Sequence, residues 1–192
     1  MDDLLAEIDR CTRCAARLPH PPRPVVSAHP ASRILIIGQA PGRLVHASGV
    51  PWQDRSGDRL REWLGVDAAT FYDPRNFALM PMGFCFPGSG PRGDLPPRPE
   101  CAPLWHQRLR AALTEVKLTL LVGRHALAHY LPVAKSSSLA DTVKTHACSG
   151  ARDVFALPHP SPRNRVWLAH NPWFAAEVVP KLQVRVAAEL AR

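Results

Sequence analysis

The sequence lacks any run of about eighteen or more uncharged apolar residues, which is the least that a membrane-spanning helix needs. Its first residues, Met1-Asp2-Asp3-Leu4, are acidic, whereas a secretory signal begins with a basic segment. The cysteines form no disulfide framework, which fits a reducing compartment. These absences predict a cytoplasmic protein that does not enter a membrane, and we expect it to be a monomer.

Internal repeats and low-complexity tails are absent as well. With 192 residues and 46% hydrophobic content, the chain is long enough to form one domain, residues 1–192, with a sizeable core. Lys and Arg outnumber Asp and Glu by 24 to 16, which gives a formal net charge of +8. Such a charge is typical of a protein that binds a polyanion, although a need for solubility alone also produces it.

Four short segments are apolar enough to be strands buried on both faces: residues 33–38, 77–83, 118–123 and 153–157. Helical patterns accompany them at residues 2–10, 56–65, 103–116, 124–131 and 172–191, the last with Asn171 as its N-cap. Parallel strands joined by helices predict a three-layer α/β/α sandwich around a four-stranded parallel sheet. Ligands bind such sheets beyond the carboxyl ends of the strands, so the loops after residues 38, 83, 123 and 157 should converge.

Four of the five cysteines form two pairs, Cys11 with Cys14 in a C-x2-C motif and Cys85 with Cys101 in a C-x15-C motif. Two intervening residues let one tight turn direct both sulfurs at one metal ion, and the second pair would close a long loop onto it. Thiolates suit a structural zinc and a [4Fe-4S] cluster alike, and unrelated core cysteines are the alternative. Cys148 stands outside this pattern and is expected to be an ordinary thiol.

Two loops at predicted strand ends carry chemically versatile residues. In Gly38-Gln39-Ala40-Pro41-Gly42, the glycines and the proline favour a tight turn that leaves main-chain N–H groups and the Gln39 amide directed at a ligand. In His159-Pro160-Ser161-Pro162-Arg163-Asn164, alternate prolines stiffen a loop with an imidazole, a hydroxyl, a cation and an amide. Rigid polar loops at strand ends tend to be functional, although His159 could also merely cap the strand.

These segments together resemble the uracil-DNA glycosylase superfamily over nearly the whole chain. Residues 38–42 are similar to its first motif, and residues 159–164 are similar to its last motif, the HPS loop. Gly49-Val50-Pro51-Trp52 resembles its G-x-P-F segment, with Trp52 as the aromatic residue that stacks on the flipped base. The cysteines match the pattern of the iron-sulfur branches, and this resemblance favours [4Fe-4S] over zinc, as a clip for the N-terminal helix and the loop of residues 85–101.

The resemblance implies a DNA repair glycosylase that hydrolyses the N-glycosidic bond of uracil, or of another deaminated base, in single- or double-stranded DNA. His159 would donate a hydrogen bond to uracil O2, and backbone N–H groups around Gln39 would stabilise the negative charge that develops there. The base would be bound by Gly38, Gln39, Ala40, Trp52, Met82, Gly83 and His159. DNA would be bound by Ser161, Arg163, Asn164 and Arg165, with Arg163 entering the base stack and Arg92 adding charge.

Two positions depart from the family pattern. Ala40 stands where some branches have a catalytic aspartate, and Asp54, in a D-x-S-G segment, resembles the aspartate of another branch and could orient the water. A helix cap is the alternative role for Asp54. Met80 stands where the better-known iron-sulfur members carry a uracil-reading asparagine, so main-chain groups near Met82 and Gly83, or Asn76, would have to replace it. A catalytically inactive DNA- or nucleotide-binding module of the same fold is therefore the alternative function.

Overall fold

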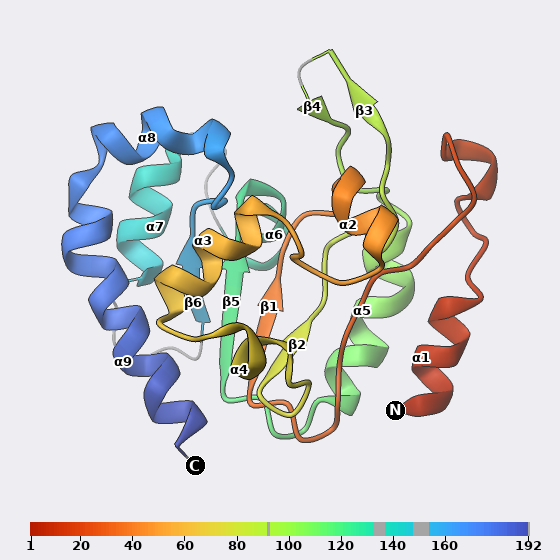
Figure 1. The fold of residues 1–192 in the computed structure, drawn as a ribbon, viewed down its shortest axis with the longest axis horizontal. Coiled ribbons are helices and arrows are strands. Elements are labelled where there is room, and N and C mark those ends of the chain that lie inside the picture. Colours follow the sequence, from red (N-terminus) through yellow and green to blue (C-terminus); the bar gives the residue numbers. More distant parts are fainter. Residues whose placement is uncertain (92, 133–136, 148–153, 192) are drawn as a thin grey trace.

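A four-stranded parallel sheet forms the centre of the structure (Figure 1). The computed structural model describes residues 1–91, 93–132, 137–147 and 154–191, so Arg92, Cys148 and Asp153 lie outside the described residues. The strand order is β2-β1-β5-β6, with bounds β1 (Ile34–Ile37), β2 (Phe77–Leu79), β5 (Leu118–Val122) and β6 (Val154–Leu157). Every pairing is parallel, and Ile36 is the register partner of Leu79 on one side and of Leu120 on the other.

Helices cover both faces of this sheet, which confirms the predicted three-layer α/β/α sandwich. Side chains alternate along β1, so that Ile34 and Ile36 join one core cluster while Leu35 and Ile37 join the other. The first cluster is closed by α3 (Arg55–Leu64), α4 (Ala68–Tyr72), α7 (Leu139–Ala147) and α9 (Val179–Leu190). The second cluster is closed by α1 (Asp2–Asp9), α5 (Cys101–Ala112) and α6 (Arg124–Tyr130).

Short elements decorate the carboxyl edge of the sheet, where the sequence patterns indicate only loops. Figure 1 shows α2, the β3–β4 hairpin and α8 beyond the strand ends. The bounds of the short elements are η1 (Ala15–Arg17), α2 (Arg43–Ser48), β3 (Ser89–Gly90), β4 (Gly93–Asp94), η2 (Pro162–Asn164) and α8 (Arg165–His170). None of the helices in the described part of the chain has the length and apolar character that crossing a membrane requires.

Two prolines explain where element bounds differ from the sequence prediction. β2 ends at Leu79 instead of continuing to Gly83, because Pro81 has no N–H to donate to a neighbouring strand. α5 begins at Cys101, two residues before Pro103. A proline in the first turn of a helix is tolerated because the N–H that it lacks would have no helical acceptor there.

The C-terminal helix also differs from the uniform helix expected over residues 172–191. A π-helical turn, η3 (Phe174–Val178), directly precedes α9. Pro180 in the first turn of α9 cannot donate to the carbonyl four residues earlier, and a wider turn accommodates that loss. Asn171 does not cap the helix with its side chain, because its Oδ1 accepts from the indole N–H of Trp173 at 3.0 Å.

Two valines of α9 provide a matched test of this packing. Val186 is 0% exposed and lies in the first core cluster, whereas Val184 is 70% exposed. We expect Val186→Ala to lower the free energy of unfolding by about 2 kcal/mol, because it removes buried methyl groups and leaves a cavity. Val184→Ala should change it by less than about 0.5 kcal/mol. Urea denaturation measures both values, and equal losses for the two variants would contradict the packing of α9.

Candidate active site

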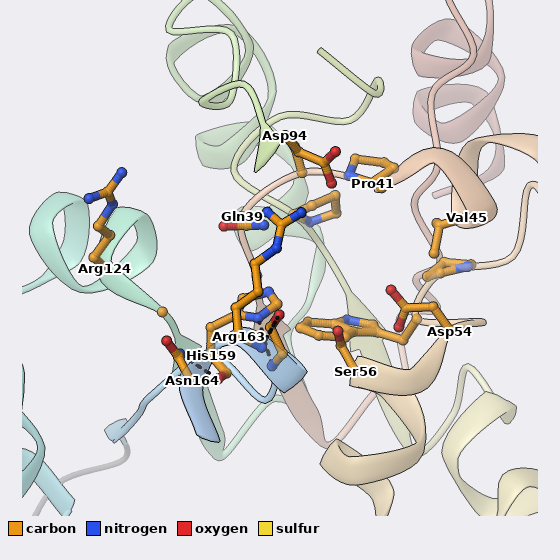
Figure 2. A pocket seen from close by; sticks show the side chains of 18 of the residues that line it. Gln39, Pro41, Val45, Asp54, Ser56, Asp94, Arg124, His159, Arg163 and Asn164 are labelled. Atoms are coloured by element: carbon orange, nitrogen blue, oxygen red, sulfur yellow. Dashed lines mark hydrogen bonds between the residues drawn. The ribbon is translucent and has the colours of Figure 1, made fainter. Parts of the chain in front are cut away.

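A cavity of about 520 Å³ lies at the carboxyl ends of the strands (Figure 2). The loops that follow β1, β2, β5 and β6 contribute to its wall through Gln39, Pro81, Arg124 and His159. The predicted convergence of these four loops is therefore confirmed. Further polar lining residues come from the start of α3 and from the β3–β4 hairpin: Asp54, Ser56 and Asp94.

The turn after β1 contributes Gly38, Gln39 and Ala40 to the cavity wall. A Cβ atom added at Gly38 would lie 2.6 Å from the indole ring of Trp52, so only glycine permits the ring to lie against the end of the strand. The Gln39 side chain faces the cavity (Figure 2). Backbone, amide and aromatic ring thus meet at one side of the cavity.

Met82 and Gly83 hold this turn from behind. The N–H of Met82 donates to the Gly38 carbonyl at 2.9 Å, and the N–H of Gly83 donates to the Gln39 carbonyl at 3.0 Å. Neither Met82 nor Gly83 is among the lining residues of the cavity. The N–H groups of Met82 and Gly83 are therefore not available to a base, because each already has an acceptor.

Met80, at the family's asparagine position, and Asn76, its expected replacement, both lie outside the cavity wall. Met80 is 1% exposed and packs in the second core cluster. Asn76 precedes β2 at the opposite edge of the sheet, where its side-chain amide donates to the Thr70 carbonyl at 3.1 Å. Side-chain amides line the cavity at Gln39 and Asn164.

Trp52 lies between the turn after β1 and the loop after β6. Its ring centroid is 5.7 Å from that of His159, with an interplanar angle of 31°. Its backbone φ is 59°, a left-handed conformation that costs about 1–3 kcal/mol for a residue with a side chain. A Cβ atom added at Gly57 would lie 1.7 Å from the Trp52 carbonyl oxygen, so the glycine of the D-x-S-G segment is required by this close approach.

Two hydrogen bonds fix the loop that carries His159. The backbone N–H of Ser161 donates to Nδ1 of His159 at 3.2 Å, and Nδ2 of Asn164 donates to the His159 carbonyl at 2.7 Å. A ring nitrogen that accepts a hydrogen bond carries no proton, so the neutral ring carries its proton on Nε2. Burial, with a smaller contribution from His125, lowers the pKa of His159 to about 4, and the ring is therefore neutral at physiological pH.

Asp54 begins α3 and lines the same cavity. Its Oδ1 accepts from the Gly57 N–H at 2.8 Å, which satisfies one of the N–H groups that a helix leaves unpaired at its start. Of the two roles that the sequence allows for Asp54, orienting a water and capping a helix, the structure therefore shows the cap. A carboxylate has two oxygens, so the cap does not exclude a second role for Oδ2.

Three of the residues expected to bind DNA line the cavity. Ser161, Arg163 and Asn164 line it, whereas Arg165 is exposed at the start of α8 and is not a lining residue. The guanidinium of Arg163 extends across the view in Figure 2 toward Gln39 and Asp94. Its Nη1 lies 1.6 Å from the position that a Cβ atom would take at Gly93, so it rests against the hairpin.

Sequence patterns do not point to Asp94 and Arg124 as lining residues. Arg124 follows Gly123 directly at the end of β5, and this position at a strand end is a signal that could have identified it. Asp94 carries no such local signal, because only tertiary contacts bring the β3–β4 hairpin over the cavity.

The four patterned cysteines line a second, smaller cavity. Cys11, Cys14, Cys85 and Cys101 all contribute to its wall, together with the apolar side chains of Pro22, Pro24, Phe84 and Trp105. The Phe84 N–H donates to Sγ of Cys101 at 3.3 Å. Residues far apart in the chain thus contribute these four cysteines to one cavity, and the metal site predicted for them stays a prediction.

Burial raises the pKa of Cys85 to about 11 and that of Cys101 to about 12, and the neighbouring cysteines contribute to both shifts. Four thiolates in such surroundings would need a cation to balance them, and four cysteine sulfurs are the ligands that zinc and iron-sulfur clusters prefer. The donor set therefore fits such a group in kind. Over the described ranges, no set of three or more His, Cys, Asp and Glu side chains is arranged as a ready-made metal site.

The parallel α/β sandwich thus brings a glycine turn, an aromatic ring and a neutral histidine together at its strand ends. The chain matches the family model described as the Uracil DNA glycosylase superfamily over residues 26–183. It therefore belongs to the uracil-DNA glycosylase superfamily. The match includes both strand-end loops, Cys85 and Cys101, and it begins after Cys11 and Cys14. Membership indicates a DNA glycosylase, a hydrolase whose partner is DNA.

The hydrogen bond from Ser161 and the burial of the ring predict the tautomer and the charge of His159. We expect His159 to be neutral at neutral pH, with its proton on Nε2, and to titrate with a pKa of about 4 because it is buried. Long-range ¹H–¹⁵N correlation spectra recorded across a pH series measure both properties, and His159→Gln identifies the signals. A charged ring, or a proton on Nδ1, at neutral pH would contradict this arrangement.

Proposed function

We propose that this protein is a uracil-DNA glycosylase that hydrolyses the N-glycosidic bond of uracil, or of another deaminated base, and leaves an abasic site in DNA. The observation that carries the proposal is the buried, neutral His159, whose Nε2–H is the donor left for a base in a cavity that also contains Trp52. Superfamily membership supports glycosylase chemistry, and the pairing of a ring with a neutral donor supports a flipped base as the substrate.

Bond cleavage would proceed with the base rotated out of the helix and stacked on Trp52. Base stacking on an aromatic ring is worth about 1–3 kcal/mol. As the C1′–N1 bond breaks, its electron pair leaves with the base, so that negative charge develops on uracil O2 and positive charge on the sugar. Nε2–H of His159 and backbone N–H groups around Gln39 donate to O2 and stabilise this charge. A neutral imidazole suffices for this role because no proton has to be transferred before cleavage.

We assign Asp54 to the attacking water. Ala40, at the position of the aspartate of other branches, carries no group that can accept a proton. Oδ1 of Asp54 caps α3, and Oδ2 is the oxygen that would orient the water, offset the positive sugar and accept the proton released as the C1′–O bond forms. The position of Asp54 in the cavity wall, beside Ser56, supports this assignment (Figure 2).

Base choice would depend on Gln39. Asn164, the other lining residue with a side-chain amide, donates to the His159 carbonyl, whereas the Gln39 amide faces the cavity. An amide offers one acceptor and two donors, which complements the pyrimidine edge of uracil. Hypoxanthine and xanthine are the alternative bases, since Met80 leaves no asparagine at the uracil-reading position.

DNA would bind across the mouth of the cavity. The Ser161 hydroxyl would contact phosphate, while Arg165 would add positive charge. Arg163 would enter the base stack, which requires its guanidinium to leave Gly93. The net charge of +8 supports a polyanionic partner. The monomeric state, the cytoplasmic location and the single domain stay predictions.

We also propose that Cys11, Cys14, Cys85 and Cys101 hold a [4Fe-4S] cluster, with zinc as the alternative. The shared cavity and the N–H donor from Phe84 to Cys101 support a thiolate-bound group. Such a group would join the end of α1, the segment after β2 and the start of α5. Its role would be structural, because these residues lie outside the wall of the larger cavity.

A non-catalytic DNA- or nucleotide-binding module is the second candidate. Ala40 in the cavity wall and the buried Met80 favour it, because neither supplies the polar group found in active branches.

A base-release assay distinguishes the glycosylase from the non-catalytic binding module. We expect the purified protein to release uracil from single- and double-stranded oligonucleotides, so that alkali breaks the strand at the resulting abasic site. His159→Ala should reduce the rate by about 10²–10³-fold, because it removes a donor to the developing charge. Oligonucleotides with hypoxanthine or xanthine test the alternative bases.

His129→Ala is the matched control for this experiment. His129 is exposed on α6 and is not a lining residue of the cavity, so its variant should cleave at the wild-type rate. If wild type and His159→Ala are equally inactive on all three lesions, the binding module is the better description.

The cluster makes a separate prediction. Protein purified without oxygen should be brown, absorb broadly in the visible range and contain about four irons per chain, and Cys101→Ser should lose most of the colour and iron. Cys148→Ser should keep both, because Cys148 lies outside the pattern. Metal analysis and absorption spectra measure these outcomes. A colourless wild-type protein with zinc would support the alternative metal, and a protein that binds neither metal would contradict both.

A further inference from the structure

Trp52 has a backbone conformation that its own residue type disfavours. Among the described residues other than glycine, it is the one with a positive φ. A left-handed backbone brings Cβ close to the following carbonyl and persists only where the surroundings hold it. The contacts that hold Trp52 therefore also determine where its ring lies in the cavity.

A chain of hydrogen bonds from α3 and α4 ends on the Trp52 backbone. The hydroxyl of Tyr72, the last residue of α4, lies 3.3 Å from the Trp52 carbonyl oxygen. Nη1 of Arg61 lies 3.1 Å from the same hydroxyl, and Nη2 of Arg61 pairs with Asp58. The Arg61 guanidinium also lies 5.4 Å from the centroid of the Tyr72 ring, so it holds the phenol by charge and by contact.

The chemistry of these groups determines which of them donates in each hydrogen bond. A guanidinium only donates hydrogen bonds and a carbonyl oxygen only accepts them, so Arg61 donates to Tyr72 and Tyr72 donates its single proton to Trp52. Burial raises the pKa of Tyr72, which keeps that proton on the hydroxyl. The carbonyl of Trp52 is thus held by one donor, and that donor is held by a second.

Two glycines leave the space that the Trp52 carbonyl and the Trp52 ring occupy. Gly57 has no Cβ that would collide with the Trp52 carbonyl, and Gly38 has none that would collide with the indole ring. The carbonyl, held by Tyr72, and the ring, placed between Gly38 and His159, therefore belong to one rigid arrangement. If the carbonyl is released, the backbone can leave the left-handed region and the ring can leave the cavity wall.

We propose that Tyr72 is a positioning residue for base recognition. Its hydroxyl holds the strained backbone of Trp52, and so presents the indole face to the base, although Tyr72 is not a lining residue of the cavity. The role in base recognition rests on the proposed glycosylase function, whereas the hold on Trp52 does not.

Tyr72→Phe removes the hydroxyl and keeps the ring, so it tests the hydrogen bond alone. We expect two changes. The near-ultraviolet circular dichroism of Trp52, defined as the difference between wild type and Trp52→Ala at wavelengths beyond tyrosine absorption, should fall to about half or less, since a mobile indole gives a weak signal. The kcat/KM for uracil in single-stranded DNA should fall about fivefold or more, mostly through KM, because stacking on Trp52 is weakened.

Ser32→Ala is the matched control. Ser32 precedes β1, at the opposite edge of the sheet from the cavity. Its hydroxyl is buried and lies 2.7 Å from the His29 carbonyl oxygen and 2.6 Å from the Pro74 carbonyl oxygen. This variant also loses a buried hydroxyl, so it shows what a general loss of stability does. It should keep the Trp52 signal and kcat/KM, when all proteins are measured well below their unfolding temperatures.

The outcomes separate this proposal from the proposed function. If wild type releases uracil and Tyr72→Phe shows both changes while Ser32→Ala shows neither, the positioning role is supported. If wild type is active and either change is missing in Tyr72→Phe, or Ser32→Ala shows the same changes, the positioning role is overturned. If wild type releases no base from any substrate, the proposed function fails and base recognition fails with it, while the Trp52 signal still decides whether Tyr72 holds that residue.

Discussion

The close approach of a glycine backbone, an indole and an imidazole is the constraint on which the cavity depends. The Trp52 ring lies where a side chain at Gly38 would be, and its centroid is 5.7 Å from that of His159. The glycine directly follows β1 and the histidine follows β6, and β5 separates these strands in the sheet. Gly123 at the end of β5 closes the gap, because a Cβ atom there would lie 3.2 Å from Cβ of His159. The strand order therefore places the groups, and the two glycines permit their contact.

The site combines a neutral donor inside with positive charge outside. Burial keeps His159 uncharged, and the Ser161 N–H selects the tautomer, so the cavity presents an oriented dipole. Arg163 and Arg165 lie at or beyond the rim, where a polyanion would meet them first. In the proposed reaction, affinity for DNA would come from the rim and stabilisation of the leaving base from the interior. The two contributions can differ between variants because they come from different groups.

The cysteine cavity and the larger cavity are connected through the chain between Cys85 and Cys101. This segment contains the β3–β4 hairpin, which brings Asp94 to the wall of the larger cavity and Gly93 against the Arg163 guanidinium. Both ends of the segment meet at the cysteine cavity. A metal group bound there would therefore fix the base of the hairpin and, through it, one side of the cavity mouth. A cluster with a purely structural role, and no redox role, would in this way affect substrate binding.

Strands buried on both faces need continuous apolar runs, while prolines stiffen turns locally and glycines permit them, so the sequence by itself determined the α/β/α class and the loops at Gly38 and His159. It left Asp54 with two possible roles, and the structure shows the cap. Only the tertiary structure decided that the Met82 N–H holds a turn instead of facing the cavity, and that the Tyr72 hydroxyl meets the Trp52 carbonyl. The physical reason is that a hydrogen bond between residues distant in the chain leaves no local pattern, since any donor can serve any acceptor until packing brings one pair together.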